Sequence, residues 1–427
     1  QPTPFVGRRR ELVQLEATWA EACLDEASRA VLVTGPAGSG KSRLRWEFHR
    51  GVREETDACT ILSGHGDSLA AGAPLGLIGP ALRRWFNIQD ADSMPRRQER
   101  TLEGCASLFG DAPELRRTVA FLGELVGAGF EESFDPSLAA ARRDPMLRGQ
   151  NMGEAFVAWL RALTRRAPVL LMLEDIHWGD SPSLKYVDEA LRELEDAPLM
   201  VLAMTRPGIE GQFPDLWSGR PLQHMNLTPL TPKACGRLID KVLETHEGEV
   251  DRQQIIRRCE GNAFYLEELI RASVGGEDGL VPDTVYGMVH ARLDALGPGA
   301  NAVLKIASIF GESFWLEGVA RQVAEDGDMH DVARELDRLV KKEVIRPKTV
   351  SSAPDQKEYR FHHALVRDAA YAMLSDKGRA RGHKRAADWL SSVGMRDPLS
   401  LAGHYDRGGD SGQAIVWYGR AAEQALE

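Results

Sequence analysis

Short apolar runs separated by stretches of helical periodicity dominate the first half of the chain. Strand-type runs occupy residues 30–34, 58–64, 168–175 and 198–205. The last two are almost continuously apolar, which is the pattern of parallel strands covered on both faces. Strands that alternate with helices predict an α/β domain built on a parallel sheet.

Helical periodicity fills the intervals between these runs. Residues 9–29 place Leu12 and Leu15 on one helical face. Another helix starts at Lys41, directly after a glycine-rich stretch, and residues 73–165 are mostly helical with proline and glycine breaks. These helices are expected to cover the two faces of the sheet.

The pattern changes after about Gln223 and becomes almost wholly helical. Residues 231–274 predict about three helices and residues 283–341 about four more. Two short strand-type segments, 342–348 and 357–361, follow these helices on either side of a polar loop. Helices that close on a hairpin predict a winged helix, so the predicted fold class is α/β followed by α.

The end of the chain has the spacing of a tetratricopeptide unit. Leu399, Ala402 and Tyr405 are followed by Ala414 and Tyr418, which puts small and aromatic residues on facing helices. One such repeat cannot bury its own apolar face, so we expect further repeats to follow. The chain begins without Met and stops within a helical pattern, and we expect it to be a piece of something longer.

Composition and charge restrict the function classes. The 427 residues predict about two to four domains. The chain carries 53 basic and 63 acidic side chains, a net charge of −10 at pH 7, which disfavours non-specific binding to nucleic acid or to a membrane. No apolar run reaches about 18 residues, the length that a membrane span needs. No apolar core of a signal peptide follows the first residues.

The cysteines point to a reducing compartment. Five of them are scattered along the chain without a CxxC pair: Cys23, Cys59, Cys105, Cys235 and Cys259. This usage is not that of a disulfide scaffold or of a zinc site. We therefore expect a cytoplasmic protein.

A glycine-rich loop between the first strand and its helix is the strongest candidate for chemistry. It has the full phosphate-loop pattern GxxxxGK[ST] at Gly35, Pro36, Ala37, Gly38, Ser39, Gly40, Lys41 and Ser42, with Arg43 next in the helix. The backbone N–H groups can wrap phosphate oxygens, and Lys41 can reach the β- and γ-phosphates. The Ser42 hydroxyl can bind Mg²⁺, and the helix N-terminus adds partial positive charge. Residues 35–43 are therefore predicted to bind a nucleotide.

Two acids end the third strand. Glu174 and Asp175 lie at the carboxyl edge of the predicted sheet, beside the phosphate loop. Two acids after a strand are by themselves more typical of a solvated turn, but the phosphate loop upstream favours catalysis. We predict that Glu174 holds Mg²⁺ through water and that Asp175 orients or deprotonates the attacking water. His177, beside them, is interpreted as a packing residue.

A cation follows the next strand. Arg206 would face the γ-phosphate and stabilise charge during transfer, or report hydrolysis. The alternative is a surface arginine before the turn at Pro207. No NKxD-type guanine signature is visible, so ATP or ADP is the expected nucleotide.

Further segments complete a set of motifs. The chain contains FVGR at 5–8, LEDIHWGDSPSL at 173–184, MTRP at 204–207, CEGNAFYLEEL at 259–269 and YRFHHALVRDAAYAML at 359–374. In combination with the phosphate loop they resemble the STAND class of AAA-related signalling ATPases. Within that class the chain is similar to the ATPase modules of large LuxR-type regulators and to modules fused to serine/threonine kinases or adenylate cyclases. The resemblance covers nearly the whole chain.

The resemblance implies an order of domains. The expected parts are a P-loop nucleotide-binding domain at 1–224, a helical lid at 225–280, a winged helix at 281–376, a linking helix at 377–395 and a first tetratricopeptide-like repeat at 396–427.

The resemblance also implies roles for residues outside the loop. Phe5, Val6 and Arg8 would lie near the adenine and ribose, with Arg8 extending toward phosphate, and Pro229 would pack near the base from the lid. His363 would contact the ADP β-phosphate from the winged helix. The motif around it reads His-His-Ala instead of the usual Met-His-Asp, so His362 is an alternative for that contact.

The function implied by the resemblance is an ATP/ADP-dependent signalling switch with slow hydrolysis. ADP would hold the winged helix on the nucleotide-binding domain. A protein or small-molecule inducer at the repeats, together with ATP, would open it, permit homo-oligomerisation and control a linked output domain or transcription.

Two alternatives stay open. The first is a DNA-binding transcriptional regulator that uses the winged helix directly, and the second is an ATP-driven remodelling enzyme. Residues 300–375 carry 11 basic and 12 acidic side chains, whereas a DNA reader usually has a basic face. Direct binding of nucleic acid is therefore disfavoured.

Overall fold

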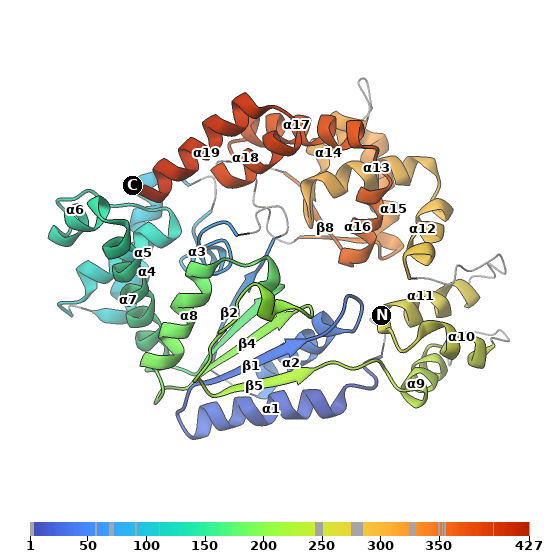
Figure 1. Cartoon of the computed structure of the whole chain (residues 1–427), viewed down its shortest axis with the longest axis horizontal. Coiled ribbons are helices and arrows are strands. Elements are labelled where there is room, and N and C mark those ends of the chain that lie inside the picture. Colours follow the sequence, from blue (N-terminus) through green and yellow to red (C-terminus); the bar gives the residue numbers. More distant parts are fainter. Residues whose placement is uncertain are drawn as a thin grey trace.

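The computed structural model shows a parallel sheet flanked by helices (Figure 1). A group of helices lies at one side of this sheet, and a small antiparallel sheet lies above the carboxyl ends of its strands. The structure describes residues 4–55, 58–67, 72–89, 92–110, 112–243, 251–274, 285–323, 329–348, 351, 353, 356–395 and 397–426. The expected boundary between lid and winged helix, at 280–281, and most of the predicted polar loop 349–356 lie outside the described residues.

Five parallel strands form the central sheet in the order β2-β3-β4-β1-β5. They are β1 (Arg29–Thr34), β2 (Thr60–His65), β3 (Val169–Glu174), β4 (Leu199–Thr205) and β5 (Leu222–Asn226). Thr34 lies opposite Thr205, and His65 lies opposite Glu174. The strands therefore end together at one edge, where the loops that follow them meet.

Four of these strands confirm the prediction from apolar runs, but β5 is a correction. The chain was expected to be almost wholly helical after about Gln223, whereas Leu222–Asn226 pairs in parallel with β1. β5 is an edge strand in which only Met225 is buried. An edge strand that is mostly exposed needs no continuous apolar run, so the pattern carried no signal for it.

Helices cover both faces of the sheet. Val31 and Val33 of β1 pack on one face with α1 and α2, and Ala30 and Leu32 point to the other face, where α7 and α8 pack. The bounds are α1 (Arg9–Leu24), α2 (Lys41–Glu55), α7 (Pro145–Thr164) and α8 (Ser181–Glu193). The first helix is shorter than the predicted 9–29 because the chain must turn before β1 begins at Arg29.

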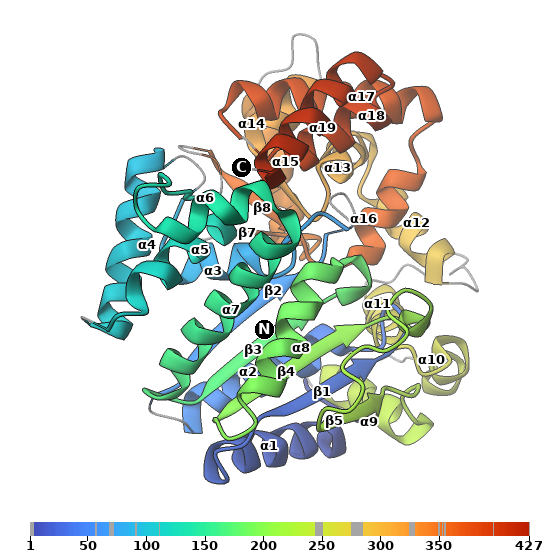
Figure 2. The same ribbon diagram turned by 60° about the vertical axis from the view of Figure 1, so that its left-hand side comes forward.

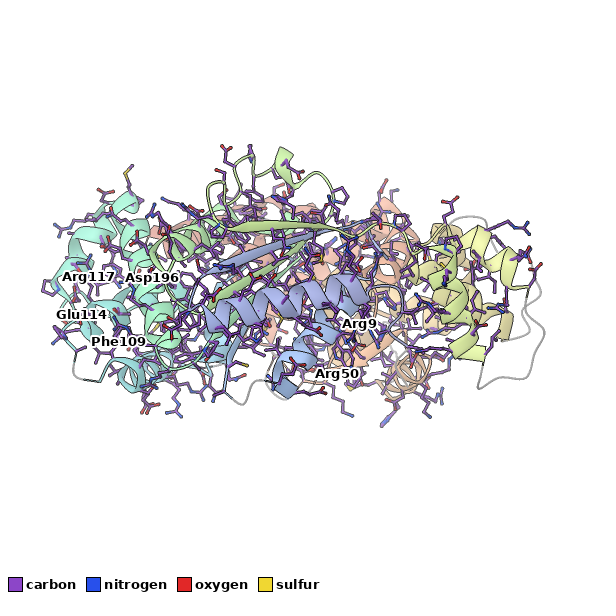
Figure 3. All side chains as sticks on the ribbon, turned by 90° about the horizontal axis from the view of Figure 1, so that it is seen from below. Arg9, Arg50, Phe109, Glu114, Arg117 and Asp196 are labelled. Carbon is purple, nitrogen blue, oxygen red and sulfur yellow. The ribbon has the colours of Figure 1, made fainter. Side chains whose placement is uncertain are left out.

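A block of helices between β2 and β3 confirms the helical character of residues 73–165. Its members before α7 are α3 (Gly79–Trp85), α4 (Met94–Phe109), α5 (Leu115–Val126) and α6 (Pro136–Arg143). The rings of Trp85 and Trp159 meet edge to face with centroids 5.3 Å apart and join the block to α7. Seen from below, Phe109, Glu114 and Arg117 lie together at one end of the molecule, far from Arg9 (Figure 3).

Three helices form what we call the lid segment, on the side of the sheet where β5 ends (Figure 1). They are α9 (Pro232–Leu243), α10 (Arg252–Cys259) and α11 (Ala263–Val274), as the pattern over 231–274 predicted. Their own core is built around Leu230, Leu238, Cys259 and Leu266.

The winged-helix segment lies above the carboxyl edge of the sheet (Figures 1 and 2). Its helices are α12 (Val285–Ala295), α13 (Pro298–Phe310), α14 (Leu316–Val323), α15 (Met329–Lys341) and α16 (Ala364–Ala372). Its strands are β6 (Ser313–Trp315), β7 (Ile345–Pro347) and β8 (Glu358–Phe361). The predicted hairpin is confirmed as β7 and β8, and β6 adds a third strand on the other side of β8.

The last helices are α17 (Asp376–Ser392), α18 (Pro398–Arg407) and α19 (Ser411–Leu426). Ala402, Tyr405 and Ala414 are buried, as the repeat spacing predicted. Tyr418 is less buried than these residues, with a side chain that is 43% exposed. Two short 3-10 turns, Ile176–Trp178 and Ile209–Gly211, complete the elements of the described residues.

Candidate functional site

The phosphate loop joins β1 to α2 at the carboxyl edge of the sheet. Gly38 and Gly40 have φ of +78° and +94°, a region in which a side chain would be strained. The Gly35 N–H donates to the Thr205 carbonyl over 3.2 Å, so the loop begins fastened to β4. Lys41 and Ser42 form the first turn of α2, where helix N–H groups are free to meet an anion.

Lys41 lies at the centre of this loop. Its Nζ donates to the carbonyls of Gly35 over 2.6 Å and Pro36 over 3.1 Å. Burial lowers the pKa of Lys41 to about 8, the Asp175 carboxylate acts in the opposite direction, and Arg206 lowers it further. The loop lysine, the second acid and the arginine after β4 are thus brought within electrostatic reach of one another.

The two acids after β3 have different surroundings. Glu174 forms an ion pair with Arg45 at 3.0 Å, and Arg45 lies one helical turn after Lys41 on α2. Asp175 has φ of +48°, a left-handed conformation that Asp tolerates better than most residues. Strained residues of this kind cluster at functional sites. The structure therefore places Asp175 beside Lys41 and holds Glu174 by Arg45.

His177 lies among these charges. Its side chain is 11% exposed, and neither ring nitrogen has a hydrogen-bond partner among the described residues. Burial lowers the pKa of His177 to about 4, Asp175 opposes the shift, and Arg206 and Lys41 add to it. The ring is neutral at pH 7. It packs beside Asp175, in agreement with the interpretation of His177 as a packing residue beside the acids.

The lid segment contacts the phosphate loop directly. Asn262 Nδ2 donates to the Ala37 carbonyl over 3.1 Å, and the Phe264 N–H donates to the Gly38 carbonyl over 3.1 Å. A Cβ at Gly38 would lie 2.6 Å from Asn262 Oδ1, so only glycine fits there. Asn262 lies within the sequence motif at 259–269, but it was not predicted as a site residue. A single polar residue after a glycine carries no local signal of such a contact.

The first motif connects the sheet to the lid segment. Phe5 packs against the core of the sheet, and Val6 packs against the core of the lid. Arg8 is 4% exposed, and its Nη2 donates to the carbonyls of Ser39 over 3.1 Å and Thr228 over 2.6 Å. Its guanidinium thus binds the backbone of the phosphate loop and of the lid entrance.

Pro229 and His363, the other two residues predicted to contact the nucleotide, lie in different parts of the site. Pro229 is exposed, and its Cβ closely approaches Gly261, which has φ of +74° and precedes Asn262. His363 stands at the start of α16 with its ring against Phe264, centroids 4.6 Å apart in an edge-to-face arrangement. Because Phe264 also bonds to Gly38, His363 is one residue removed from the phosphate loop.

An ion pair joins the end of β2 to the winged-helix segment. His65 Nε2 lies 2.7 Å from Glu312 Oε2. Burial opposes the charge on His65, but the Glu312 carboxylate outweighs it and, with Glu174 and Asp175, raises the pKa of His65 to about 9. Burial also opposes the charge on Glu312, but His65 outweighs it and, with Arg360 and Arg367, lowers the pKa of Glu312 to about 2. The sequence prediction contained neither residue.

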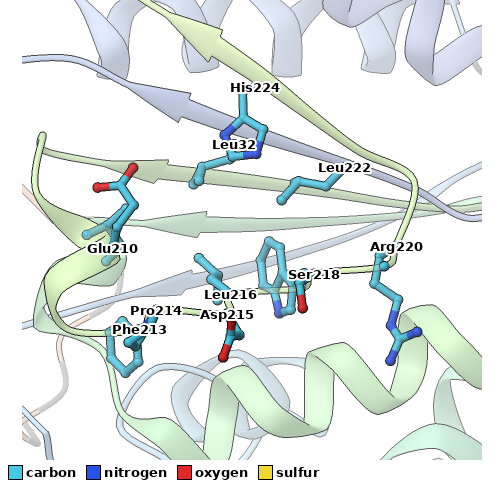
Figure 4. Close-up of a pocket in the computed structure, with 13 residues that line it drawn as sticks. Leu32, Glu210, Phe213, Pro214, Asp215, Leu216, Ser218, Arg220, Leu222 and His224 are labelled. Carbon is cyan, nitrogen blue, oxygen red and sulfur yellow. The ribbon is translucent and has the colours of Figure 1, made fainter.

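A pocket of about 320 Å³ lies elsewhere, between β1, β5 and the segment after β4 (Figure 4). Leu32, Phe213, Leu222 and His224 are among the residues that line it. It contains no residue of the phosphate loop and neither acid of β3, so it is separate from the candidate nucleotide site.

Among the described residues, no helix is long and apolar enough to cross a membrane. In the same part of the chain, no three or more His, Cys, Asp or Glu side chains are grouped so that they could hold a metal ion. A phosphate-bound Mg²⁺ needs no such cluster, because substrate oxygens and water supply most of its ligands.

The family model of the AAA ATPase domain matches residues 4–202. These residues include the phosphate loop and both acids of β3. Over these residues the chain is similar to the AAA ATPase domain.

Two relatives extend over almost the whole chain. An uncharacterized protein of Rhizobium meliloti (strain 1021) is 23% identical over 445 residues, which cover 99% of this chain and 41% of that protein. The signal transduction ATPase with numerous domains (STAND) protein with a tetratricopeptide repeat sensor from Pyrococcus horikoshii has a TM-score of 0.50 at 15% identity, over 99% of this chain and 54% of that chain. Cdc6p from Pyrobaculum aerophilum is matched with a TM-score of 0.42 at 13% identity, over 91% of this chain and 97% of that chain.

The likeness to the Pyrococcus protein shows a shared fold, in agreement with the predicted fold class. The chain spans 41% of the length of the Rhizobium relative and 54% of that of the Pyrococcus protein.

Proposed function

We propose that the AAA ATPase domain of this chain works as an ATP/ADP-dependent switch that passes its nucleotide state to the winged-helix segment. The observation that carries the proposal is a double contact at the phosphate loop. Phe264 of the lid segment bonds to Gly38 through its backbone and packs its ring on His363 of the winged-helix segment. A nucleotide held by this loop touches the residues on which three segments meet.

The residues of the loop fit a nucleotide with Mg²⁺. The left-handed glycines turn the backbone around phosphate-sized space, and Ser42 offers its hydroxyl at the first turn of α2. Ser42 and, through water, Glu174 would hold Mg²⁺, which would supply positive charge to the phosphates. Arg45 would keep the Glu174 carboxylate in place through their ion pair.

Hydrolysis is assigned to the residues around Lys41. Lys41 would exchange its loop carbonyls for the β- and γ-phosphate oxygens, and Arg206 would stabilise charge on the γ-phosphate as it is transferred. Asp175 would orient the attacking water and accept its proton. We expect slow turnover, because the proposed role is that of a regulator rather than of an enzyme with continuous flux.

The adenine and ribose are assigned to the junction of sheet and lid. Phe5 and Val6 pack on the two sides of that junction, and Pro229 is exposed at its entrance. Arg8 would act by holding the Ser39 and Thr228 carbonyls together, which fixes the distance between loop and lid.

His363 is the residue proposed to distinguish ADP from ATP. In the closed arrangement it would donate to the ADP β-phosphate, and the winged-helix segment would stay docked. A ligand shifts a conformational equilibrium only by its differential affinity for the two states. The loss of one hydrogen bond to a charged group, about 1.5–3 kcal/mol, should weaken ADP roughly ten- to hundredfold in His363→Ala. ATP bound to an open form should be much less affected.

The experiment measures ADP and ATP affinities together with mass and shape in solution. Wild type is expected to be compact with ADP and to assemble with ATP, while His363→Ala should lose ADP faster and assemble more readily. In the single variant His362 could make the contact in place of His363. The His362→Ala/His363→Ala double variant removes both histidines. Unchanged ADP affinity and assembly in that variant would refute the clamp.

The repeat segment is proposed to receive the inducer. Among the described side chains of α19, three large apolar or aromatic ones are exposed: Ile415 at 71%, Val416 at 48% and Tyr418 at 43%. Such a face suits a further repeat helix or an apolar ligand. We propose that inducer binding there, with exchange of ADP for ATP, opens the winged helix, permits homo-oligomerisation and controls a linked output domain or transcription.

A further inference from the structure

The end of β2 packs tightly against the turn that carries Glu174 and Asp175. A Cβ at Gly66 would lie 2.3 Å from the Asp175 carbonyl, and the Gly66 N–H donates to the Glu174 carbonyl over 2.9 Å. On the other side, a Cβ at Gly64 would lie 2.3 Å from the Leu77 carbonyl. His65 therefore lies between two glycines, and the backbones of these glycines pack closely against the Asp175 and Leu77 carbonyls. The backbone next to His65 therefore lies directly against the turn that carries Asp175.

Glu312 is part of the winged-helix segment, and its backbone is hydrogen-bonded to β8. It stands between α13 and β6, and its carbonyl accepts the Phe361 N–H over 3.0 Å. Phe361 is the last residue of β8 and directly precedes His362 and His363. The carboxylate that pairs with His65 therefore belongs to the same piece of backbone as the proposed ADP sensor.

The His65–Glu312 pair thus connects the turn of Glu174 and Asp175 with the backbone that carries His363. The proposed switch requires these two sites to change together. One partner lies opposite Glu174 in the sheet register and braces Asp175. The other moves with His363. The side chains are 36% and 33% exposed, so solvent screens the attraction without abolishing it.

We propose that His65 is a positioning residue for the hydrolytic acids and that its pairing with Glu312 makes their position depend on the docked winged helix. This inference rests on the proposed switch. When the winged-helix segment docks, Glu312 holds the end of β2 and thereby the turn of Glu174 and Asp175. When it leaves, His65 is released and the turn can take another arrangement.

The expected size follows from the exposure of the pair. A partly screened ion pair contributes up to about 1 kcal/mol, which corresponds to roughly fivefold in a rate or equilibrium constant. Glu312→Gln and His65→Gln should each release ADP about fivefold faster. If the two groups act only through each other, the double variant should be no faster than either single variant.

A matched control is available in the same segment. Arg271 of the lid pairs with Glu343 of the winged-helix segment at 2.7 Å, with 35% and 48% exposure, and this pair does not touch β2. Glu343→Gln should leave ADP release within about twofold of wild type. Equal acceleration by Glu343→Gln would show that any charge pair across these segments matters and would overturn the assignment to His65.

The experiment follows release of a fluorescent ADP analogue and single-turnover ATP hydrolysis at low and high salt. In wild type, salt should accelerate release, because it weakens the pair, and in Glu312→Gln that salt effect should be lost. Single-turnover hydrolysis should change in His65→Gln but not in Glu343→Gln. Glu312→Asp, which retains the charge, should restore part of the wild-type rate if Glu312→Gln folds poorly.

The failures of the two proposals are distinguishable. A wild-type protein with the same shape and assembly in ADP and ATP would remove the switch itself. A wild-type protein that switches, combined with additive effects of His65→Gln and Glu312→Gln or with none, would overturn the inference about His65 alone.

Discussion

Asn262 offers a sharp test of how the lid segment controls the nucleotide site. Its Nδ2 donates to the Ala37 carbonyl of the phosphate loop over 3.1 Å, and its Oδ1 accepts the Tyr265 N–H over 3.1 Å. The second bond caps the start of α11 within the lid, whereas the first joins the lid to the loop. Substitutions at Asn262 can therefore separate stability of the lid from its closure.

The two bonds predict two magnitudes. Asn262→Ala loses both the helix cap and the loop contact, each about 1 kcal/mol. Asn262→Ser retains a capping oxygen but is too short to reach Ala37, so it loses the loop contact alone. Because that contact exists only while the lid lies on the loop, Ser should weaken ADP about fivefold with little loss of thermal stability. Ala should weaken ADP to a similar extent and also lower the melting temperature.

The assay combines ADP affinity by fluorescence titration with thermal unfolding of the free protein. A different cap lies at the start of α10, where the Gln254 N–H donates to Asp251 Oδ1 over 2.9 Å. Asp251→Ala is therefore a control that removes a cap of the lid without touching the loop. The reasoning is refuted if Asn262→Ser binds ADP as tightly as wild type, or if Asp251→Ala weakens ADP as much as Asn262→Ser does.

Three further predictions concern the loop, the acids and a buried histidine pair. Lys41→Ala should abolish nucleotide binding, and stabilisation of that variant by ATP or ADP equal to wild type in a thermal shift assay would contradict the assignment. Asp175→Asn should bind ATP but lose turnover, while Glu174→Gln should need more Mg²⁺; the reverse result would exchange the two roles. His383 and His404 meet through Nδ1 atoms 3.0 Å apart, and burial lowers their pKa values to about 4 and about 3. Because the unfolded chain then binds more protons, stability should be present above pH 6.5 and fall as pH drops from about 6.5 toward about 4, with a smaller fall in His404→Asn.

The phosphate loop and the buried strands were predictable because their signals are local. Gly35 to Ser42 is a contiguous pattern, and a strand before it with a helix after it is enough to shape a phosphate cradle. β3 and β4 are covered on both faces and so must be apolar at nearly every position. In both cases the physical requirement falls on neighbours in sequence, and the sequence displays it.

Tertiary structure alone decided the rest of the site. β5 forms because β1 offers a free edge, His65 meets Glu312, and Asn262 meets Ala37, each between segments far apart in the chain. Before folding, such a histidine, glutamate or asparagine is indistinguishable from an ordinary surface residue. Its role depends on which backbone carbonyl or charge the packed cores bring within about 3 Å, because a hydrogen bond forms only at short distance and an ion pair weakens as the charges separate.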